Sequence, residues 1–473
     1  MYTSLSALNR HRALPIHARR LFHKGATTRI RGTTSSIAIL GSPVPWDQPP
    51  TPRKTVKNKK TSHGGSRSQA LSVHHPIEHD SSAPEPSFYS EEIDDYASKR
   101  THRITLQSLL TMCEPPLTRE KLLKNAQYLS YERPVRYAKR VKLFQRLPFI
   151  VNTNPFIHDV YLKYYCNFEE SHNYPLVKTP EDQAGFIQML IRHSDSLKHI
   201  MPQIARGFYE TRLYFGPKER KLFLDQLITM RIGLRLLTSQ HIALYNKYLA
   251  ATGQPSEDDP TDQADCDRFT GIVDDSIVLG NFVQMCAQGV QALCEMALGD
   301  APSFVIDGDT KAVFRYVPSH LEYMVIELLK NAFRSSLLQA DDSASDRNEI
   351  PPVLITVSRG NGKVAIRIRD RGGGIPRRIH SKVFDYSFTT AKHHNSMDDT
   401  AGEEQGDPTT AAFDSAPEGQ GPFAGLGFGL PMTKIYAEYF GGSLHLISLE
   451  EYGCDVFLEL PSIKADHAPQ IHI

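Results

Sequence analysis

The chain has 473 residues, of which 40% are hydrophobic, and its 54 Lys and Arg residues nearly balance 53 Asp and Glu residues. This length predicts two domains plus tails, and the small net charge excludes a general polyanion binder, so we expect no nucleic-acid partner. The six cysteines form no C-x-x-C pair and no apolar run reaches about 18 residues, which argues against a zinc site, a disulfide framework and a membrane span.

Residues 1–46 are basic, rich in Ser and Thr, and free of acidic residues, since the first acidic residue is Asp47. This composition, with leucine recurring along it, is typical of a mitochondrial transit peptide; a disordered basic tail is the alternative. Residues 47–103 are rich in Pro, Ser, Lys and His over most of their length, and we expect a disordered linker there.

Residues 104–250 show apolar residues at helical spacing, with helix starts predicted at Pro180 and Pro217. Three or four long amphipathic segments with short connections predict a helical bundle. The acidic, polar residues 251–267 predict a loop after it.

From residue 268 the pattern changes to helices that alternate with strands. A capping box from Ser319 to Glu322 predicts a helix over about 320–340, and Gly441 predicts the end of a last helix over about 430–440. Two strands are expected near 443–448 and 454–460. Two more are predicted on either side of a turn at 361–362, from the alternating residues Val353, Ile355, Val357, Val364, Ile366 and Ile368.

Helices grouped with a mostly antiparallel sheet indicate the α+β class, in the form of an α/β sandwich over residues 268–462. Residues 392–420 contain few large apolar side chains, and we expect a mobile loop there.

Three segments of this second domain carry candidate chemistry, and the first is the sequence ELLKNA at 327–332. Glu327 and Asn331 are four residues apart, so they share one face of the predicted helix. A carboxylate beside a carboxamide can hold a metal-bound phosphate and polarise a hydroxyl group. Taken alone, the pair is also typical of a solvated helix face.

The second segment, DRGGGIP at 370–376, places an acidic residue at a strand end with three glycines close behind it. A buried carboxylate at Asp370 can accept a hydrogen bond from an exocyclic amine, and glycines let a backbone approach a ligand closely. The alternative is a plain glycine turn.

The third segment contains Gly425, Gly427 and Gly429 just before the last helix. Free N–H groups and the helix dipole attract anions, so a phosphate cradle is predicted. The segment lacks the G-K-[ST] ending of a Walker P-loop, and it is not a Rossmann fingerprint.

In this order and spacing, the three segments resemble the N, G1 and G2 boxes of the GHKL ATPase superfamily. Further segments resemble the mitochondrial 2-oxo acid dehydrogenase kinases, which act on pyruvate or branched-chain complexes. They are FDYSFTTA at 384–391, GFGLP at 427–431, YAEYFGG at 436–442, LPFI at 147–150 and RIGLRLL at 231–237. The resemblance covers about residues 105–462 and implies an N-terminal four-helix-type bundle, a regulatory domain, followed by a GHKL domain with a lid insertion at 392–420.

The resemblance also implies a role for each site residue. Glu327 is the candidate general base, Asn331 the ligand of Mg²⁺, and Asp370 the acceptor for the adenine amino group of ATP. K⁺ is an optional second cation. Residues that shape the pocket, meet the lid or wrap the phosphates are Gly372, Gly374, Thr389, Thr390, Gly425, Leu426, Gly427, Phe428 and Gly429.

The activity implied is serine phosphorylation of the E1α subunit of a 2-oxo acid dehydrogenase complex in the mitochondrial matrix, which inactivates that complex. The bundle is expected to dock on the lipoyl domain of E2, and a homodimer is an open expectation. Tyr323, four residues before Glu327, matches the branched-chain members, while the choice between pyruvate and branched-chain E1 stays open.

Two other classes of function remain alternatives at this stage. In a two-component histidine kinase, His241 would accept the phosphate, although a histidine in an apolar helix is more typical of a protein core. The other is an ATP-gated binding module without transfer activity, against which the presence of Glu327, Asn331 and Asp370 argues.

Overall fold

The computed structural model describes residues 90–114, 116–252, 268–342, 350–360, 362–388 and 427–462. The predictions for residues 1–46 and 47–89, and for the insertion at 392–420, lie outside these ranges, as do four predicted site residues: Thr389, Thr390, Gly425 and Leu426. Within the described ranges, every helix is too short or too polar to span a bilayer.

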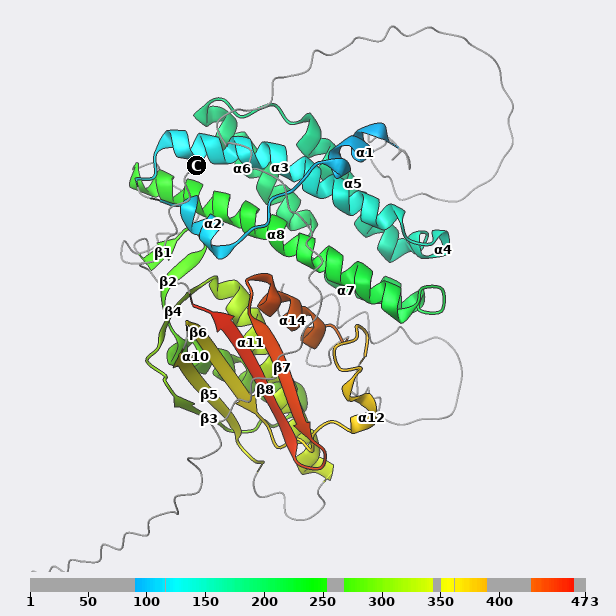
Figure 1. Cartoon of the computed structure of the whole chain (residues 1–473), viewed down its shortest axis with the longest axis vertical. Helices are drawn as coiled ribbons and strands as arrows, with labels where there is room; N and C mark the ends of the chain where they lie inside the picture. The colour runs from blue at the N-terminus through cyan, green and yellow to red at the C-terminus, as the bar shows by residue number, and fades with distance from the viewer. Residues whose placement is uncertain are drawn as a thin grey trace, which may run out of the picture. The chain divides into compact units, whose positions relative to one another are not determined.

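The first half of the described chain is helical (Figure 1). Its helices are α1 (Glu91–Ser98), α2 (Leu106–Thr111), α3 (Arg119–Gln145), α4 (Phe149–Asn152), α5 (Pro155–Asn173), α6 (Pro180–Ser196), α7 (Ile200–Glu210) and α8 (Pro217–Ala251). The long helix α3 packs against α5, α6 and α8, and α6 also packs against α8. The predicted four-helix-type bundle is therefore confirmed.

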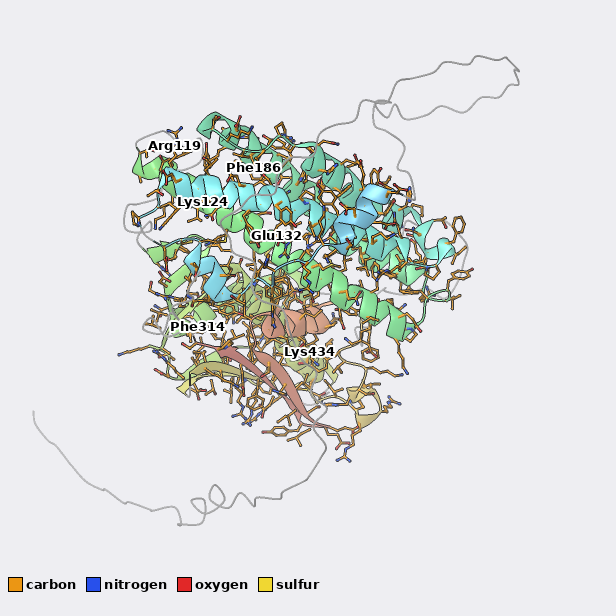
Figure 2. The ribbon with its side chains drawn as sticks, turned by 45° about the horizontal axis from the view of Figure 1, so that its top comes forward. Arg119, Lys124, Glu132, Phe186, Phe314 and Lys434 are labelled. Atoms are coloured by element: carbon orange, nitrogen blue, oxygen red, sulfur yellow. The ribbon has the colours of Figure 1, made fainter. Side chains whose placement is uncertain are left out.

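Local chemistry explains where the bundle helices begin. Thr179 forms a capping box with Asp182 at the start of α6, and Pro180 occupies the first turn, where its missing N–H costs nothing. Pro217 takes the same place in α8. Apolar side chains fill the space between the helices; Phe186 of α6, labelled in Figure 2, is 1% exposed.

The linker predicted over 47–103 is wrong at its C-terminal end, where residues 91–98 form α1. Three acidic residues lie in the first turn of this helix, where they complement the helix dipole. Its Ile93 is buried, and α1 packs against α3. Tyr96 of the same helix also packs against this core. Composition averaged over the whole linker conceals these few apolar residues.

The second half combines two sheets with helices. Its elements are β1 (Phe269–Thr270), β2 (Val273–Val278), α10 (Leu279–Leu298), β3 (Phe304–Gly308), β4 (Val313–Tyr316), α11 (Pro318–Asp342), β5 (Val353–Gly360), β6 (Lys363–Arg369), α12 (Arg377–His380), α14 (Gly429–Tyr439), β7 (Ser443–Leu449) and β8 (Gly453–Pro461). The larger sheet has the order β3-β5-β6-β8-β7, and the smaller has the order β1-β2-β4. Among the strands that the structure describes, only β3 and β5 pair in parallel.

The larger sheet buries one set of alternating side chains against the helices. Ile355 pairs with Ile368 and Val357 with Ile366, and all four are buried. The helices α10, α11 and α14 contact strands of this sheet, and Figure 1 shows α10 and α11 behind it. The predicted α+β class and sandwich are therefore confirmed.

The start of α11 differs from the sequence prediction. The helix begins at Pro318, and the amides of His320 and Leu321 both donate to the carbonyl of Val317. Proline is favoured at the first helical position because its fixed φ suits the helix, so Ser319 lies inside the first turn. The predicted capping box from Ser319 is therefore wrong, although the helix itself is confirmed.

Candidate functional site

Helix α11 presents the first of the three segments. Glu327 and Asn331 lie one turn apart; the side chain of Glu327 is 12% exposed, and Asn331 is exposed. Lys330 forms an ion pair with Glu327 at 2.6 Å, and its own side chain is 7% exposed. A solvent-facing Lys330, which its position on a helix allowed, is therefore excluded, and the carboxylate has a cation beside it.

Asp370 follows the last residue of β6, as the sequence predicts. Its side chain is buried, and Oδ1 accepts hydrogen bonds from the amides of Gly372 at 2.9 Å and Cys454 at 3.2 Å. Burial raises the pKa of this carboxyl group above its ordinary value, and the two backbone hydrogen bonds partly oppose that rise. Asp370 is thus a fixed, desolvated acceptor.

The glycines after Asp370 are needed for close approach to α11 and β7. A Cβ atom on Gly372 would lie 2.4 Å from the side chain of Ser335, and one on Gly374 would lie 2.1 Å from the carbonyl oxygen of Leu449. The Ser335 hydroxyl, which donates to the carbonyl of Ala332, also lowers the pKa of Asp370. Because Ser335 is four residues after Asn331, helical spacing already placed it on this face, although the sequence interpretation did not include it.

The third segment meets the first at Glu327. A Cβ atom on Gly429 would lie 2.4 Å from Oε2 of Glu327, so the start of α14 packs directly on that carboxylate. Gly427 has φ +72°, and a Cβ there would overlap the backbone of Phe388. The side chain of Phe428 is buried against the ring of Tyr386, which leaves the backbone of Phe428 to contact a ligand.

The start of α14 is suited to an anion. Gly429 and Leu430 occupy the first two positions of the helix, where backbone N–H groups have no partner within the helix. The helix dipole adds a partial positive charge at the same end. This end of α14 touches Glu327 of α11, and Ser335 of α11 interacts with Asp370, so α11 connects all three segments.

The donors present also fit a Mg²⁺ ion bound together with phosphate. Mg²⁺ takes oxygen ligands, keeps several waters and needs only one or two protein groups when phosphate oxygens complete its shell. The exposed amide of Asn331 lies one turn from Glu327, on the helix that packs against the start of α14. An amide oxygen in this place suits such a shared ion.

Comparisons with known proteins agree with this arrangement. The family model described as mitochondrial branched-chain alpha-ketoacid dehydrogenase kinase matches residues 103–274. The model described as histidine kinase-, DNA gyrase B-, and HSP90-like ATPase matches residues 316–464. Isozyme 4 of the mitochondrial pyruvate dehydrogenase (acetyl-transferring) kinase of Homo sapiens is 30% identical over 357 residues, which span 73% of this chain and 78% of the relative.

The chain belongs to the mitochondrial 2-oxo acid dehydrogenase kinase family. Two other similar proteins are mitochondrial pyruvate dehydrogenase (acetyl-transferring) kinases. That of Arabidopsis thaliana is 29% identical over 391 residues, spanning 81% of this chain and 97% of the relative. That of Schizosaccharomyces pombe is 34% identical over 299 residues, which span 62% of this chain and 61% of the relative.

The second domain of this kinase-family chain is an ATP-binding domain of the GHKL type, because the ATPase model spans all the described site residues. The helical half carries the match to the kinase family. The resemblance inferred from the sequence is therefore confirmed for both halves.

His241 lies on α8 of the bundle, and in the sequence it precedes all three of these segments. It is 0% exposed on α8, and neither ring nitrogen has a hydrogen-bond partner among the described residues. Burial, with a smaller effect of Arg133, lowers the pKa of His241 to about 4. A neutral, enclosed imidazole fits the core histidine expected from the sequence better than a phosphate acceptor.

Replacing His241 by Leu is expected to weaken the pH dependence of stability while kinase activity persists. In the unfolded chain a histidine binds a proton near pH 6.5, whereas in the fold it does so only near pH 4. Native stability is therefore lost as pH falls through this window, by about 3 kcal/mol for such a shift. Urea unfolding at pH 7.5 and 5 measures it: between these two pH values the free energy of unfolding should fall less for the variant than for wild type. Parallel losses in both proteins would contradict the interpretation.

Replacing Gly374 by Ala is expected to destabilise the fold by about 3 kcal/mol, because alanine at φ +71° is strained and its Cβ meets the Leu449 carbonyl. The melting temperature should fall, and the dissociation constant of Mg-ADP should rise. The matched control is Gly360→Ala at the end of β5, where nothing lies within 4 Å of the added Cβ. Equal stability of the two variants would contradict the close approach at Gly374.

Proposed function

We propose that the chain is a protein serine kinase of the mitochondrial matrix. It transfers the γ-phosphoryl group of ATP to the E1α subunit of a 2-oxo acid dehydrogenase complex and thereby inactivates that complex. The observation that carries this proposal is the contact of Glu327 with Gly429, which puts a carboxylate at the anion-binding start of α14. A phosphate held there has a base beside it.

In this proposal Glu327 removes the proton from the attacking serine hydroxyl. The nearby Lys330 ammonium, paired with this carboxylate at 2.6 Å, adds positive charge near the transferred group. Phosphoryl transfer needs little covalent help from the protein, because positioning and charge neutralisation supply most of the catalysis. The start of α14 and the Lys330 ammonium supply the positive charge, and Glu327, whose side chain is 12% exposed, is positioned beside both.

Asn331 would hold Mg²⁺, which would neutralise phosphate charge when bound, and K⁺ is a further candidate cation. Asp370 would accept a hydrogen bond from the adenine amino group, with Gly372 and Gly374 shaping the wall around the base. The backbone of Gly427, Phe428 and Gly429 would wrap the phosphates. Gly425 and Leu426 would also wrap the phosphates, and Thr389 and Thr390 would lie where the lid meets the nucleotide.

The remaining parts of the chain follow from the same proposal. Residues 1–46 would direct import into the matrix, and 104–250 would be the regulatory bundle that docks on the lipoyl domain of E2. Residues 268–462 would be the kinase domain, with the lid insertion at 392–420. Association into a homodimer is part of the proposal as well.

We favour the pyruvate complex as the target, because the similar proteins named above are pyruvate dehydrogenase kinases. The branched-chain complex is the second candidate, since the family model that matches the bundle carries that name. Tyr323, four residues before Glu327, also favours this second candidate, because it matches the branched-chain members. It packs against Tyr436, with ring centroids 4.8 Å apart.

The test is to incubate the full chain with Mg-ATP and purified pyruvate E1 or branched-chain E1, side by side. We expect phosphoserine on the α subunit and loss of dehydrogenase activity, faster for pyruvate E1. Phosphate that is stable to base and labile to acid would indicate a histidine kinase instead. ATP binding without transfer to either substrate would indicate a binding module, and either result would overturn the proposal.

A further inference from the structure

A hydrogen bond connects the helical half to the segment that precedes the lid. The hydroxyl of Tyr386 donates to Oδ1 of Asp225 on α8 at 2.7 Å. Tyr386 is 4% exposed, and burial together with the Asp225 carboxylate raises the pKa of its hydroxyl, which therefore stays protonated as a donor. This is a charge-assisted hydrogen bond between residues 161 positions apart.

The same tyrosine packs against the glycine segment of the site. Its ring lies 5.1 Å from that of Phe428, the residue that precedes α14. The next amide, that of Ser387, donates to the carbonyl of Gly427 at 3.2 Å. Gly427 and the backbone of Phe388 are so close that a Cβ would not fit between them. Residues 386–388 and 427–429 therefore form one packed pair of segments.

The first turns of α8 surround Asp225 and Tyr386 with charge. Lys221 pairs with Asp225 at 3.3 Å and lies 5.3 Å from the centroid of the Tyr386 ring. Arg220 interacts electrostatically with Asp385, the residue before Tyr386. The contact of α8 with this segment thus involves several side chains, and the hydrogen bond to Tyr386 is its best-defined member.

We propose that Tyr386 and Asp225 are positioning residues, which hold residues 427–429 in the arrangement that receives the phosphates of ATP, so that α8 sets nucleotide affinity. The proposal rests on the proposed function, whose ATP site it extends into the helical half. It gives a route from the bundle to Glu327, because Gly429 lies against that carboxylate.

The physical reason is conformational entropy. A glycine-rich segment loses much freedom when it becomes ordered around a ligand. If the Tyr386 hydrogen bond orders it beforehand, the nucleotide meets a formed site; if the bond is lost, the nucleotide must select a minor conformation and its apparent affinity falls.

The experiment measures the dissociation constant of Mg-ADP for the full chain by titration calorimetry. Tyr386→Phe keeps the ring contact with Phe428 and removes only the hydroxyl, while Asp225→Ala removes the acceptor. Each is expected to raise the dissociation constant about tenfold, the effect of losing one charge-assisted hydrogen bond. Asp225→Asn keeps an acceptor oxygen and is expected to restore most of the affinity. The double variant should lose no more than either single variant.

The controls match these changes in chemistry. Asp159→Ala removes a carboxylate that pairs with Lys163 one turn away on α5, just as Asp225 pairs with Lys221 on α8. Tyr209→Phe removes the hydroxyl of an exposed tyrosine on α7. Both controls should bind Mg-ADP like wild type.

Affinity unchanged by Tyr386→Phe would overturn the proposal, and so would fully additive losses in the double variant. A lower melting temperature with unchanged affinity would show a merely structural bond, which also overturns it. The readout is independent of phosphate transfer. Wild-type protein that binds Mg-ADP but does not phosphorylate E1 would defeat the proposed function, while leaving this test to be decided on the dissociation constants.

Discussion

Replacing Glu327 by Gln is expected to lower kcat for E1 phosphorylation by about 10²- to 10⁴-fold, the usual contribution of a general base. Glutamine keeps the size of the side chain beside Gly429 but cannot accept the serine proton at neutral pH. The affinity for Mg-ATP should change by less than about threefold, because the proposed phosphate donors are backbone groups of α14. Single-turnover phosphorylation and calorimetry measure the two quantities separately.

Glu322→Gln is the matched control for this change, since Glu322 is exposed on the same helix. It should retain wild-type kcat. If Glu327→Gln retained kcat as well, Glu327 would not be the base. If it lost nucleotide binding and activity together, its role would be in binding and not in proton removal.

Replacing Asp370 by Asn is expected to raise the dissociation constant of Mg-ATP by about 100-fold or more. The amide can keep an oxygen for the backbone N–H groups of Gly372 and Cys454, which preserves the fold. Its NH₂ group would then face the adenine amino group, donor against donor, in a desolvated site. Calorimetry with ATP and with inosine triphosphate should show that the variant has lost the preference for the 6-amino base.

The pH dependence of binding tests the same group. The pKa of Asp370 is raised above its ordinary value, so ATP affinity should fall as the pH drops through that raised pKa and the carboxylate becomes protonated. Asp370→Asn has nothing to protonate there and should lose this part of the pH dependence. The matched control is Asp455→Asn: Asp455 is a nearby carboxylate on β8 that pairs with Arg367 and Arg369. Loss of affinity in that control alone would contradict the assignment.

Much of the fold could be predicted because local patterns determine it. Alternating apolar residues identified β5 and β6, and the register confirms that Val357 and Ile366 face the same side. Helical spacing placed Glu327 and Asn331 on one face of α11. At the start of α11 two local signals compete, a proline suited to the first helical position and a capping box from Ser319. The proline determines the start, so α11 begins at Pro318.

The contacts that connect the site could not be predicted, because they join residues distant in sequence. Asp225 and Tyr386 are 161 positions apart, and no periodicity relates them. The burial of Lys330 depends on what packs around α11, since an exposed helix position and a buried one can share the same spacing. Cys454 reaches Asp370 through its backbone amide, which any residue type would supply.

The most direct measurement is an experimental structure of the full chain with Mg-ADP bound. We expect the adenine amino group within hydrogen-bond distance of Asp370, the ion on Asn331, and the β-phosphate against the amides that begin α14, on the side facing Glu327. A nucleotide bound elsewhere, with Asp370 and Gly429 both free of it, would contradict the assignment of these three segments to one ATP site.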